Sequence, residues 1–289
     1  MRISKKELSR DEMGAMSPKE FREMIRQGEL PETESPQFYC RGYSQHGVAM
    51  IPRDYAFEFL LFCNRNPRPC YVCDVTEPGS PHAPFLAPKA DLRTDLPRYT
   101  VFKDGKVIDE PTDVKKYWRD DLVSFLLACS WGWAGPARAY NVNFRYIGAY
   151  TTNIPCVPAG RFKCDHMIVS SSVFKTSYDA VRAIQICSRL PCGHGAPIHI
   201  GDPSAIGIKN IYEPDVYHPY PISPLEPNEV ILTWGCAVTP VNAIKEAKPP
   251  LAIHSYPGQV FVSDRLTEEL AYTYTNEFVT GLGARVEKG

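Results

Sequence analysis

A short segment with two histidines and one carboxylate is a candidate for proton-transfer chemistry. Residues 194–203 read HGAPIHIGDP. Alternation of side chains along a strand would place Ile198 and Ile200 on one face and His199 on the other. The Gly-Asp-Pro that follows ends the strand, and ligands usually bind at the carboxyl ends of strands in open α/β sheets. We therefore expect His199 and Asp202 to act as catalytic acid and base, with His194 in contact with the substrate.

A purely structural role and a metal site are the two alternatives for the same residues. Two histidines and a carboxylate suit iron(II) or zinc, but the spacing H-x4-H-x2-D is not a recognised metal-binding signature. Cys70-x-x-Cys73 has the form of half a zinc or redox motif, yet it lies in a predicted strand and the chain holds no second such pair. The sequence also lacks a Walker-type phosphate-binding loop. We therefore expect no bound metal and no cofactor.

Cys236 is a candidate catalytic nucleophile. It follows a predicted strand that ends at Trp234-Gly235, and it precedes a predicted helix. The N-terminus of that helix could lower the pKa of the thiol. The alternative is a buried cysteine whose role is packing, and the sequence leaves both interpretations open.

Asp121 and two arginines are candidates for binding and deprotonating a carboxylate substrate. Asp121 is predicted to lie close to the apolar stripe of a long helix over residues 113–129, where burial of an unpaired carboxylate is costly. Its pKa could therefore be raised for catalysis beside a substrate-binding Arg93 or Arg119. The alternative is that one of these arginines is simply its ion-pair partner.

Thr152 and Asn153 offer a hydroxyl and an amide group beside a proline turn. Such groups can stabilise a developing oxyanion, although the same side chains also cap turns. We expect Asn153 to take part in catalysis and Thr152 to contact the substrate.

The elements that must position these residues are short, because the 27 prolines of the chain interrupt regular structure throughout. Besides the helix over 113–129, helices are predicted from Pro18 to a stop at Gly28 and over 53–63, 178–189 and 241–247. Strands are predicted over 70–76, 167–171, 197–200, 230–234, 251–254 and 259–263, with a hairpin over 99–108 around the Asp104-Gly105 turn.

This order of elements indicates an α/β protein, with a two-domain mixed α/β arrangement. The main domain is expected to be discontinuous and to comprise residues 1–148 and 226–289. A smaller two-layer α/β unit, residues 149–225, is expected to be inserted into it. The 289 residues are enough for one large domain or two modest ones.

Composition excludes several classes of function. The formal net charge is −1, and no basic run is interleaved with aromatic residues, so nucleic-acid binding is not expected. No apolar run approaches the roughly 20 residues of a membrane span, and the first residues lack the apolar core of a secretory signal. The ten cysteines are therefore expected to be reduced thiols. We expect a cytoplasmic protein rather than one of the mitochondrial matrix. Its expected partner is a small carboxylate or amino-acid substrate, and the protein could form a homo-oligomer.

Six segments in succession resemble the hydro-lyase family that includes D-glutamate cyclase. They read FLLFCNRNPRPC at 59–70, DVTEPGSP at 74–81, ADLRTDLP at 90–97, WRDDLV at 118–123, TNIPC at 152–156 and HGAPIHIGDP at 194–203. The similarity runs in order from about Glu20 to Glu269. Chance does not produce an ordered match over nearly the whole chain.

The resemblance implies a two-domain α/β fold and a reaction that adds or removes water. In D-glutamate cyclase, the amine of glutamate attacks its own distal carboxyl group, and water leaves to give 5-oxoproline. This ring closure is intramolecular, so it is plausible without ATP. It needs a cation for a carboxylate, groups that shuttle protons, and donors for the oxyanion. Candidates for these three needs are, in turn, Arg93 or Arg119; His199 with Asp202, or Asp121; and Thr152 with Asn153.

Two departures from the family pattern concern the substrate. Ala134 stands where the family usually has Glu, and Thr151 stands where it usually has Arg. The loss of an acid and a cation suggests a pocket less suited to a doubly charged amino acid, or a loss of activity. We therefore expect a lyase of the dehydrating or cyclodehydrating type that acts on an amino acid or related small carboxylate. The alternatives are a Cys236-dependent acyl transferase or hydrolase, and a non-catalytic small-molecule-binding homologue.

Overall fold

Two antiparallel β-sheets form the centre of the structure, a computed structural model that describes residues 8–30, 35–218 and 221–272. The larger sheet contains β1 (Tyr43–Pro52), β2 (Val72–Val75), β3 (Tyr99–Lys103), β4 (Lys106–Asp109), β5 (Leu122–Ala128), β10 (Ala252–Ser255) and β11 (Phe261–Leu266). Its strand order is β2-β5-β1-β10-β3-β4, and β11 pairs with the first residues of β1. The smaller sheet contains β6 (Phe144–Thr151), β7 (Ile168–Phe174), β8 (His199–Ile200) and β9 (Val230–Gly235), in the order β6-β7-β9-β8.

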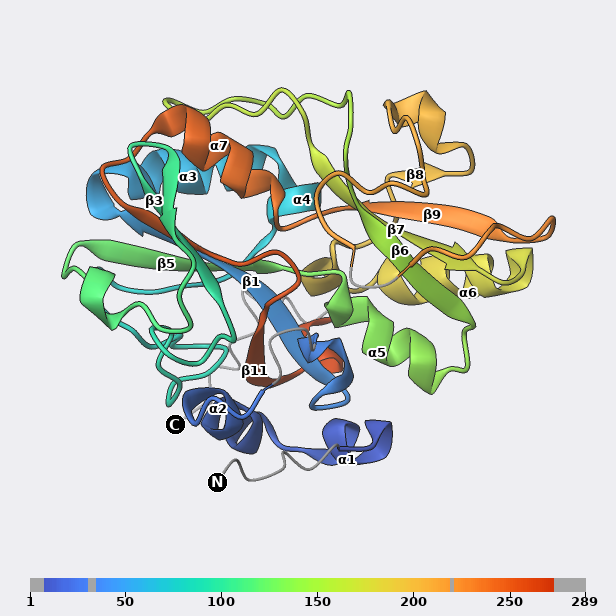
Figure 1. Ribbon diagram of the computed structural model, residues 1–289, viewed down its shortest axis with the longest axis horizontal. Helices are drawn as coiled ribbons and strands as arrows, with labels where there is room; N and C mark the ends of the chain where they lie inside the picture. Colours follow the sequence, from blue (N-terminus) through green and yellow to red (C-terminus); the bar gives the residue numbers. More distant parts are fainter. Residues whose placement is uncertain (1–7, 31–34, 219–220, 273–289) are drawn as a thin grey trace.

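Seven α-helices accompany these sheets in the described part of the chain. They are α1 (Arg10–Ala15), α2 (Pro18–Arg26), α3 (Arg53–Arg65), α4 (Pro67–Cys70), α5 (Trp131–Ala139), α6 (Ser177–Cys187) and α7 (Thr239–Ala247). Figure 1 shows α3 and α7 together above the larger sheet, and α5 beside α6 next to the smaller one. None of the described helices is long and apolar enough to cross a membrane.

Most predicted elements are confirmed, but the long helix over residues 113–129 is wrong. The structure has a 3-10 turn at Lys115–Tyr117 and then strand β5. All seven residues of β5 are buried, because β5 lies between β1 and β2. A strand covered on both faces is a continuous apolar run, and such a run has no period that distinguishes it from a buried helix. Asp121 therefore precedes a strand and does not lie on a helix face.

Five elements had no counterpart in the sequence prediction: helices α1, α4 and α5, and strands β1 and β6. Strand β1 carries polar residues and a glycine, and β6 contains Gly148. Helix α5 contains two glycines and Pro136 within its nine residues, a composition with low intrinsic helix propensity. Burial of α5 against its neighbours overrides that propensity, since six of its residues are buried.

The sheets confirm a mixed α/β protein but correct one step of the sequence argument. Every strand pair of the two sheets is antiparallel. The rule that ligands bind at the carboxyl ends of parallel strands therefore does not apply to Asp202. Strand β9 pairs with β7 and β8, although it follows the expected domain boundary at residue 226. The division into domains stays a prediction.

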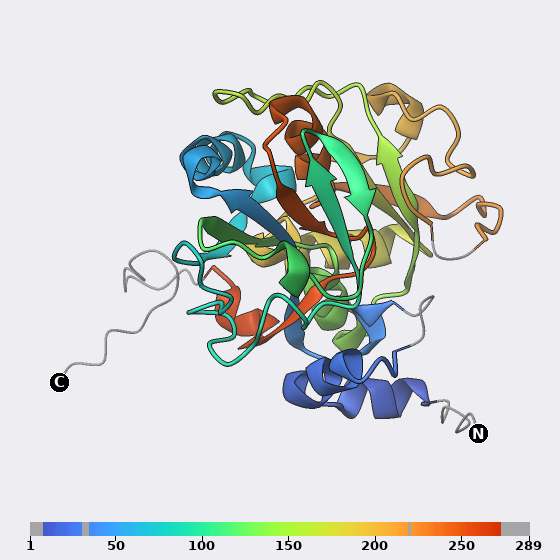
Figure 2. The ribbon, with the colours of Figure 1, turned by 60° about the vertical axis from the view of Figure 1, so that its left-hand side comes forward.

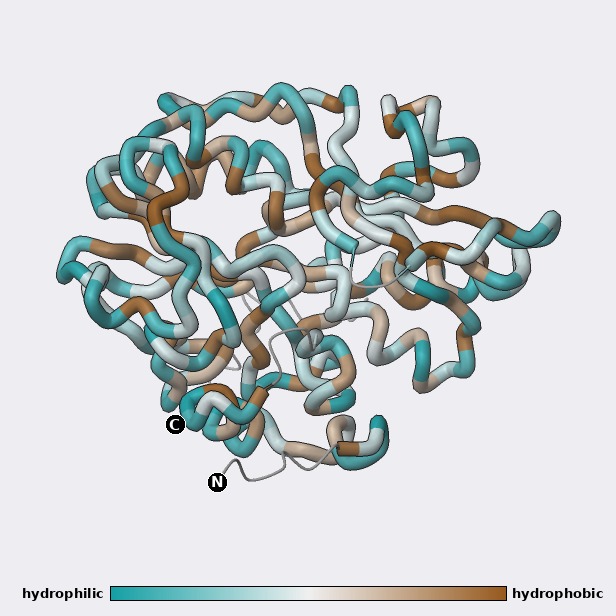
Figure 3. Tube along the Cα trace, in the orientation of Figure 1, coloured by the Kyte–Doolittle hydropathy of each residue, from teal (hydrophilic) through white to brown (hydrophobic). Residues whose placement is uncertain are grey.

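An aromatic cluster joins α5 to the smaller sheet. Trp133 of α5 stacks on Trp234 of β9, with ring centroids 4.5 Å apart, and Phe174 of β7 lies 6.1 Å from both. The indole N–H of Trp234 donates to the carbonyl oxygen of Gly195 at 3.0 Å. Figure 3 shows the hydrophobic residues of β5 and β9 as brown segments of the trace. These contacts fix the turns that precede α5 and follow β9.

A buried arginine attaches the N-terminal helices to the larger sheet. Arg22 of α2 donates to the carbonyl oxygen of Val262 at 2.9 Å and to the Asp264 carboxylate at 2.7 Å. Its Nε lies 3.6 Å from a carboxylate oxygen of Asp95. In Figure 2 the two N-terminal helices, in dark blue, lie below the sheets. Helix α2 is thus held against strand β11.

Removal of the Trp133–Trp234 stack should weaken the whole fold. We expect Trp234→Ala to lower the free energy of unfolding by about 3–5 kcal/mol, because a large buried side chain is lost and a cavity remains. Urea denaturation followed by circular dichroism measures this change. The matched control is Phe57→Ala on α3, since Phe57 is 76% exposed and should change stability by at most about 0.5 kcal/mol. Equal effects of the two substitutions would contradict the assignment.

Candidate active site between the two sheets

A cavity lies where strand ends of the larger sheet meet those of the smaller sheet. Side chains with a thiol, hydroxyl or imidazole group make up its polar lining: Cys129, Ser130, Tyr146, Ser170, Tyr217, Cys236, His254, Ser255 and Tyr256. None of the described residues that line it is an aspartate, glutamate, lysine or arginine. Any acid–base chemistry in this cavity therefore depends on imidazole, thiol and hydroxyl groups.

His254 of β10 provides a neutral imidazole in the wall of the cavity. The residue is 1% exposed, and its Nδ1 lies 2.7 Å from the carbonyl oxygen of Ser255. A carbonyl oxygen only accepts, so Nδ1 carries the proton and Nε2 is left as an acceptor. Burial lowers the pKa of His254 to about 4, although the carbonyl groups of Ser255 and Ala237 favour the charged form. Nε2 is buried and has no hydrogen-bond partner in the described part of the chain.

Cys129 and Cys236 occupy equivalent positions on the two sides of the cavity wall. Each follows the last residue of a strand, β5 or β9, and each precedes a helix, α5 or α7. Burial raises the pKa of Cys129 to about 12 and that of Cys236 to about 11. The N–H groups of Trp131 and Val238 point to the respective sulfur atoms and offset this effect in part. Both groups are therefore protonated thiols near neutral pH.

Two hydroxyl groups connect the sheets across the cavity. Ser130 Oγ and Ser170 Oγ lie 2.7 Å apart, and both residues are buried. Only one of the two can donate in this bond, so the proton of the other hydroxyl is available to a ligand.

A glycine brings the larger sheet close to the Cys236 turn. A Cβ atom on Gly47 of β1 would lie 2.8 Å from the Cβ of Ala237, closer than two carbon atoms can pack. The chain therefore needs glycine at this position to bring β1 against the residue that follows Cys236.

Of the site residues predicted from the sequence, Cys236 lines the cavity. His199 and Asp202 are not among the lining residues. His199 Nε2 lies 2.7 Å from the carbonyl oxygen of Asp202. The exposed Asp202 carboxylate accepts from the backbone N–H of Ser204 at 2.9 Å and from its hydroxyl at 2.8 Å. These bonds close a turn at Pro203–Ile206, a role that a short carboxylate commonly has at a helix start.

His194, Thr152 and Asn153 also lie outside the cavity lining. His194 is buried in a left-handed conformation, and its Nδ1 lies 2.7 Å from the carbonyl oxygen of Arg68. The Thr152 hydroxyl donates to the carbonyl oxygen of Met167 at 2.8 Å, while Asn153 is exposed. The three residues connect neighbouring chain segments and do not converge on one point.

The predicted arginines form ion pairs within their own loops. Arg93 contacts the Asp91 carboxylate at 2.8 Å, and Arg119 contacts the Asp121 carboxylate at 2.6 Å. The ion-pair interpretation of Asp121 therefore describes the structure, and none of these residues lines the cavity. Ala134 and Thr151 are absent from the lining as well.

The cysteines are consistent with the expected reduced state. All ten are free thiols, and Cys70 and Cys73 are buried. Within the described residues, no group of three or more histidine, cysteine, aspartate or glutamate side chains is placed to hold a metal ion. The histidine pair at 194 and 199 thus does not form a metal site with Asp202.

Sequence reasoning missed His254, Ser130 and Ser170. These residues lie on separate strands or turns, and only the meeting of the two sheets brings them together. One local signal was available, because His254-Ser-Tyr-Pro-Gly places a histidine at a strand end before a turn, as in the segment around His199.

Comparison with known families connects this cavity to a class of enzymes. A family model described as D-glutamate cyclase matches residues 123–264. Every residue that lines the cavity lies within this match except Gly47. The cavity is therefore built almost wholly from the part of the chain that characterises the family.

Curated relatives extend the similarity over most of the chain. A protein of Geobacillus kaustophilus named "Putative hydro-lyase" is 44% identical over 88% of this chain and 97% of its own length. Similar proteins of Bacillus licheniformis and Stutzerimonas stutzeri are 43% and 40% identical, each over 88% of this chain and over 97% and 96% of their own lengths. A solved nitrogen repressor-like protein of Methanococcus jannaschii matches with a TM-score of 0.36 and 8% identity over 86% of this chain and 99% of that chain, too weak a likeness to support an argument.

These similarities cover the two sheets and the cavity between them, and they confirm the resemblance found in the sequence. The chain belongs to the hydro-lyase family that carries the D-glutamate cyclase domain.

Proposed function

We propose that this chain is a lyase that dehydrates or cyclises an amino acid or related small carboxylate in the cavity between the sheets. The supporting observation is the coincidence of the D-glutamate cyclase match with the lining of that cavity. The buried imidazole of His254 and the thiols that line the same cavity are the acid–base groups that such a reaction needs.

In this proposal, the N-termini of helices α5 and α7 stabilise the negative charge of the substrate carboxylate. The cavity lining holds no cationic side chain, so an anion depends on helix N-termini and on hydroxyl donors. Both helices begin within three residues of a lining cysteine, and the positive end of a helix dipole stabilises a nearby negative group by roughly 0.3–1 kcal/mol. The Ser130–Ser170 hydroxyl pair supplies the further donor.

A cyclodehydration in this cavity moves two protons from nitrogen to the departing oxygen. His254 Nε2 accepts one proton from the substrate ammonium, and the free amine attacks the distal carboxyl carbon to form the C–N bond. The hydroxyl pair donates to the developing oxyanion. A lining thiol and the imidazolium each protonate the departing oxygen, the C–O bond breaks, and water leaves. The second nitrogen proton restores the thiol, so the reaction requires no ATP and no net change of the protein.

Substitution of His254 tests this assignment. The substitution His254→Asn keeps a hydrogen-bond donor near the position of Nδ1 and removes Nε2. We therefore expect the rate of 5-oxoproline formation from D-glutamate to fall by about 10²–10⁴-fold, the range for loss of a general base. Chromatography of the reaction mixture with mass detection measures the product. A wider screen of amino acids and carboxylates for loss or gain of one water covers an altered substrate.

Two matched variants make the result specific. His166 is exposed and its Nδ1 lies 2.9 Å from the carbonyl oxygen of Thr152, so His166→Asn removes the same kind of ring contact outside the cavity and should keep the wild-type rate. Loss of activity in His199→Asn with full activity in His254→Asn would move the site to the surface turn of His199. Thermal stabilisation by D-glutamate without any turnover would favour a non-catalytic binding protein.

Reaction with iodoacetamide distinguishes the lyase from an acyl transferase or hydrolase. Cys236 lines the cavity, so its thiol is placed where it could form a thioester with a substrate. Burial, however, raises the pKa of this thiol to about 11. We therefore expect slow alkylation of Cys236 at pH 7 and, in Cys236→Ser, a reduced but measurable rate. Rapid alkylation that abolishes activity, together with a dead Cys236→Ser, would support the nucleophilic alternative.

The pH profile should reflect the lowered pKa of His254. The neutral imidazole is the active form, and its pKa is about 4, so activity falls only as the pH approaches that value. Thiols with raised pKa values stay protonated well above neutral pH. We expect a plateau of kcat/KM from about pH 5 to about pH 9. A limb near pH 6.5 that disappears in His254→Asn would contradict the burial of a neutral imidazole.

A further inference from the structure

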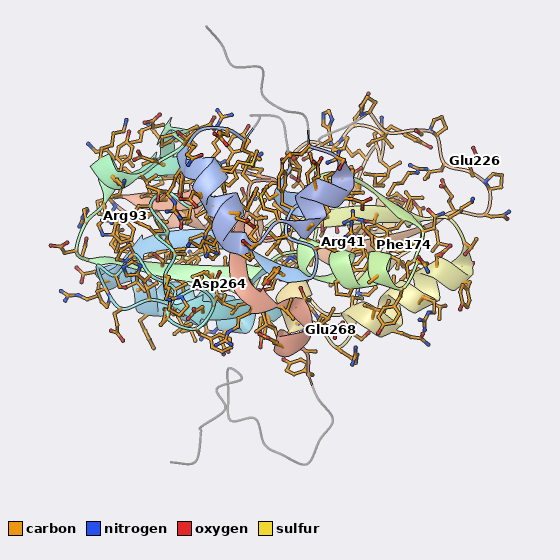
Figure 4. The ribbon with its side chains drawn as sticks, turned by 90° about the horizontal axis from the view of Figure 1, so that it is seen from below. Arg41, Arg93, Phe174, Glu226, Asp264 and Glu268 are labelled. Carbon is orange, nitrogen blue, oxygen red and sulfur yellow. The ribbon has the colours of Figure 1, made fainter. Side chains whose placement is uncertain are left out.

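A second cavity, which we call the arginine pocket, lies between the N-terminal segment and helix α5. Three arginines line it, namely Arg10, Arg41 and Arg138, together with Phe38 and Gln45. No described lining residue is an aspartate or a glutamate. In Figure 4, Arg41 lies next to the N-terminal helices. The pocket is thus a cationic hollow on a protein of nearly zero net charge.

The side chain of Arg138 is compensated by aromatic rings instead of a carboxylate. Its guanidinium lies 5.4 Å from the ring centroid of Phe38 and 5.1 Å from that of Phe144. The guanidinium of Arg10 lies 3.7 Å from the same Phe38 ring. Arg138 donates to the amide oxygen of Gln37 at 3.4 Å. It takes part in none of the ion pairs of the described residues. Arg138 is an exposed residue, and desolvation by the protein around its guanidinium, with the like charge of Arg10, lowers its pKa.

A buried acceptor without a donor lies in the same pocket. Gln45 of β1 is 3% exposed, and its Nε2 donates to the carbonyl oxygen of Pro36 at 3.1 Å. Its Oε1 is buried and has no hydrogen-bond partner in the described part of the chain. A buried acceptor of this kind costs about 1–3 kcal/mol unless a donor reaches it. The pocket therefore offers guanidinium donors and one acceptor.

From this combination of guanidinium donors with one buried acceptor, we infer that the arginine pocket binds a small carboxylate that also carries an N–H or O–H donor. The carboxylate accepts from Arg138, with Arg41 beside it. The donor of the ligand reaches Gln45 Oε1. Arg41 is partly neutralised by Asp11 at 3.0 Å, so Arg138 carries the main attraction. The site is distinct from the cavity of the proposed reaction.

The arginine pocket and the cavity between the sheets share one lining residue. Trp131, the first residue of α5, lines both the arginine pocket and the cavity between the sheets. Its ring also contacts Tyr146 in an edge-to-face arrangement at 4.9 Å. Most lining residues of the arginine pocket lie before residue 123, outside the D-glutamate cyclase match. The pocket therefore belongs to this N-terminal segment and not to the family domain alone.

Ligand-induced thermal stabilisation tests the inference without any assay of turnover. The probes are 5-oxo-D-proline, which has a carboxylate and an N–H; acetate, which has no such donor; and inorganic phosphate. We expect 5-oxo-D-proline to raise the melting temperature in a salt-sensitive way, and acetate to do so much less at equal concentration. Arg138→Gln should weaken the apparent affinity at least about tenfold, the factor that corresponds to loss of one charged hydrogen bond. Gln45→Met should weaken the binding of 5-oxo-D-proline but leave the binding of acetate unchanged.

Control variants separate this pocket from the proposed active site. Arg182→Gln on α6 removes an arginine that also lies over an aromatic ring, Tyr140 at 5.8 Å, and should leave binding unchanged. His254→Asn should lower the rate of turnover by about 10²–10⁴-fold and retain the stabilisation, so failure of one proposal does not imply failure of the other. Stabilisation that persists in Arg138→Gln and disappears in His254→Asn would overturn the inference, as would the absence of any effect of 5-oxo-D-proline. Stronger stabilisation by phosphate than by 5-oxo-D-proline would overturn the assignment to carboxylates.

Discussion

The stack of Trp133 on Trp234 is the contact on which the site depends. Trp234 lies two residues before Cys236, and Trp133 lies four residues after Cys129. Their rings, 4.5 Å apart, therefore connect the two strand-to-helix turns that carry the thiols. The indole N–H of Trp234 also holds the loop of Gly195. Because aromatic packing of this kind is rigid on the scale of a side chain, it sets the position of each thiol relative to the other.

Burial then sets the protonation states in the cavity. With no charged side chain in the lining, desolvation acts without an opposing ion pair. It favours the neutral form of His254 and the protonated forms of Cys129 and Cys236. A neutral base and neutral acids in one site can exchange protons with a substrate without a large change in net charge. This property suits a reaction in which water is the only other product.

The sequence predicted local structure well where periodicity and turn chemistry were strong. The capping box at Ser17, the Asp104-Gly105 hairpin and the helix α7 all appear close to their expected bounds. The family was also recognisable from ordered motifs. The prediction was wrong for β5, because a strand buried on both faces is as apolar as a buried helix. Strand β1 was missed because its polar residues Ser44, Gln45 and His46 are buried in pairings that only the sheet provides.

The site was harder to predict than the fold for a physical reason. His199 and Asp202 are close in sequence and form a local turn, whereas His254 meets Ser130 and Cys236 only through long-range packing of two sheets.

NMR of isotopically labelled imidazole rings is the most direct test of the role assigned to His254. The account predicts that His254 is the neutral Nδ1–H tautomer at pH 7, titrates near pH 4, and shifts when D-glutamate is added. Titration of His254 near pH 6.5, or a ligand shift confined to His199, would contradict it.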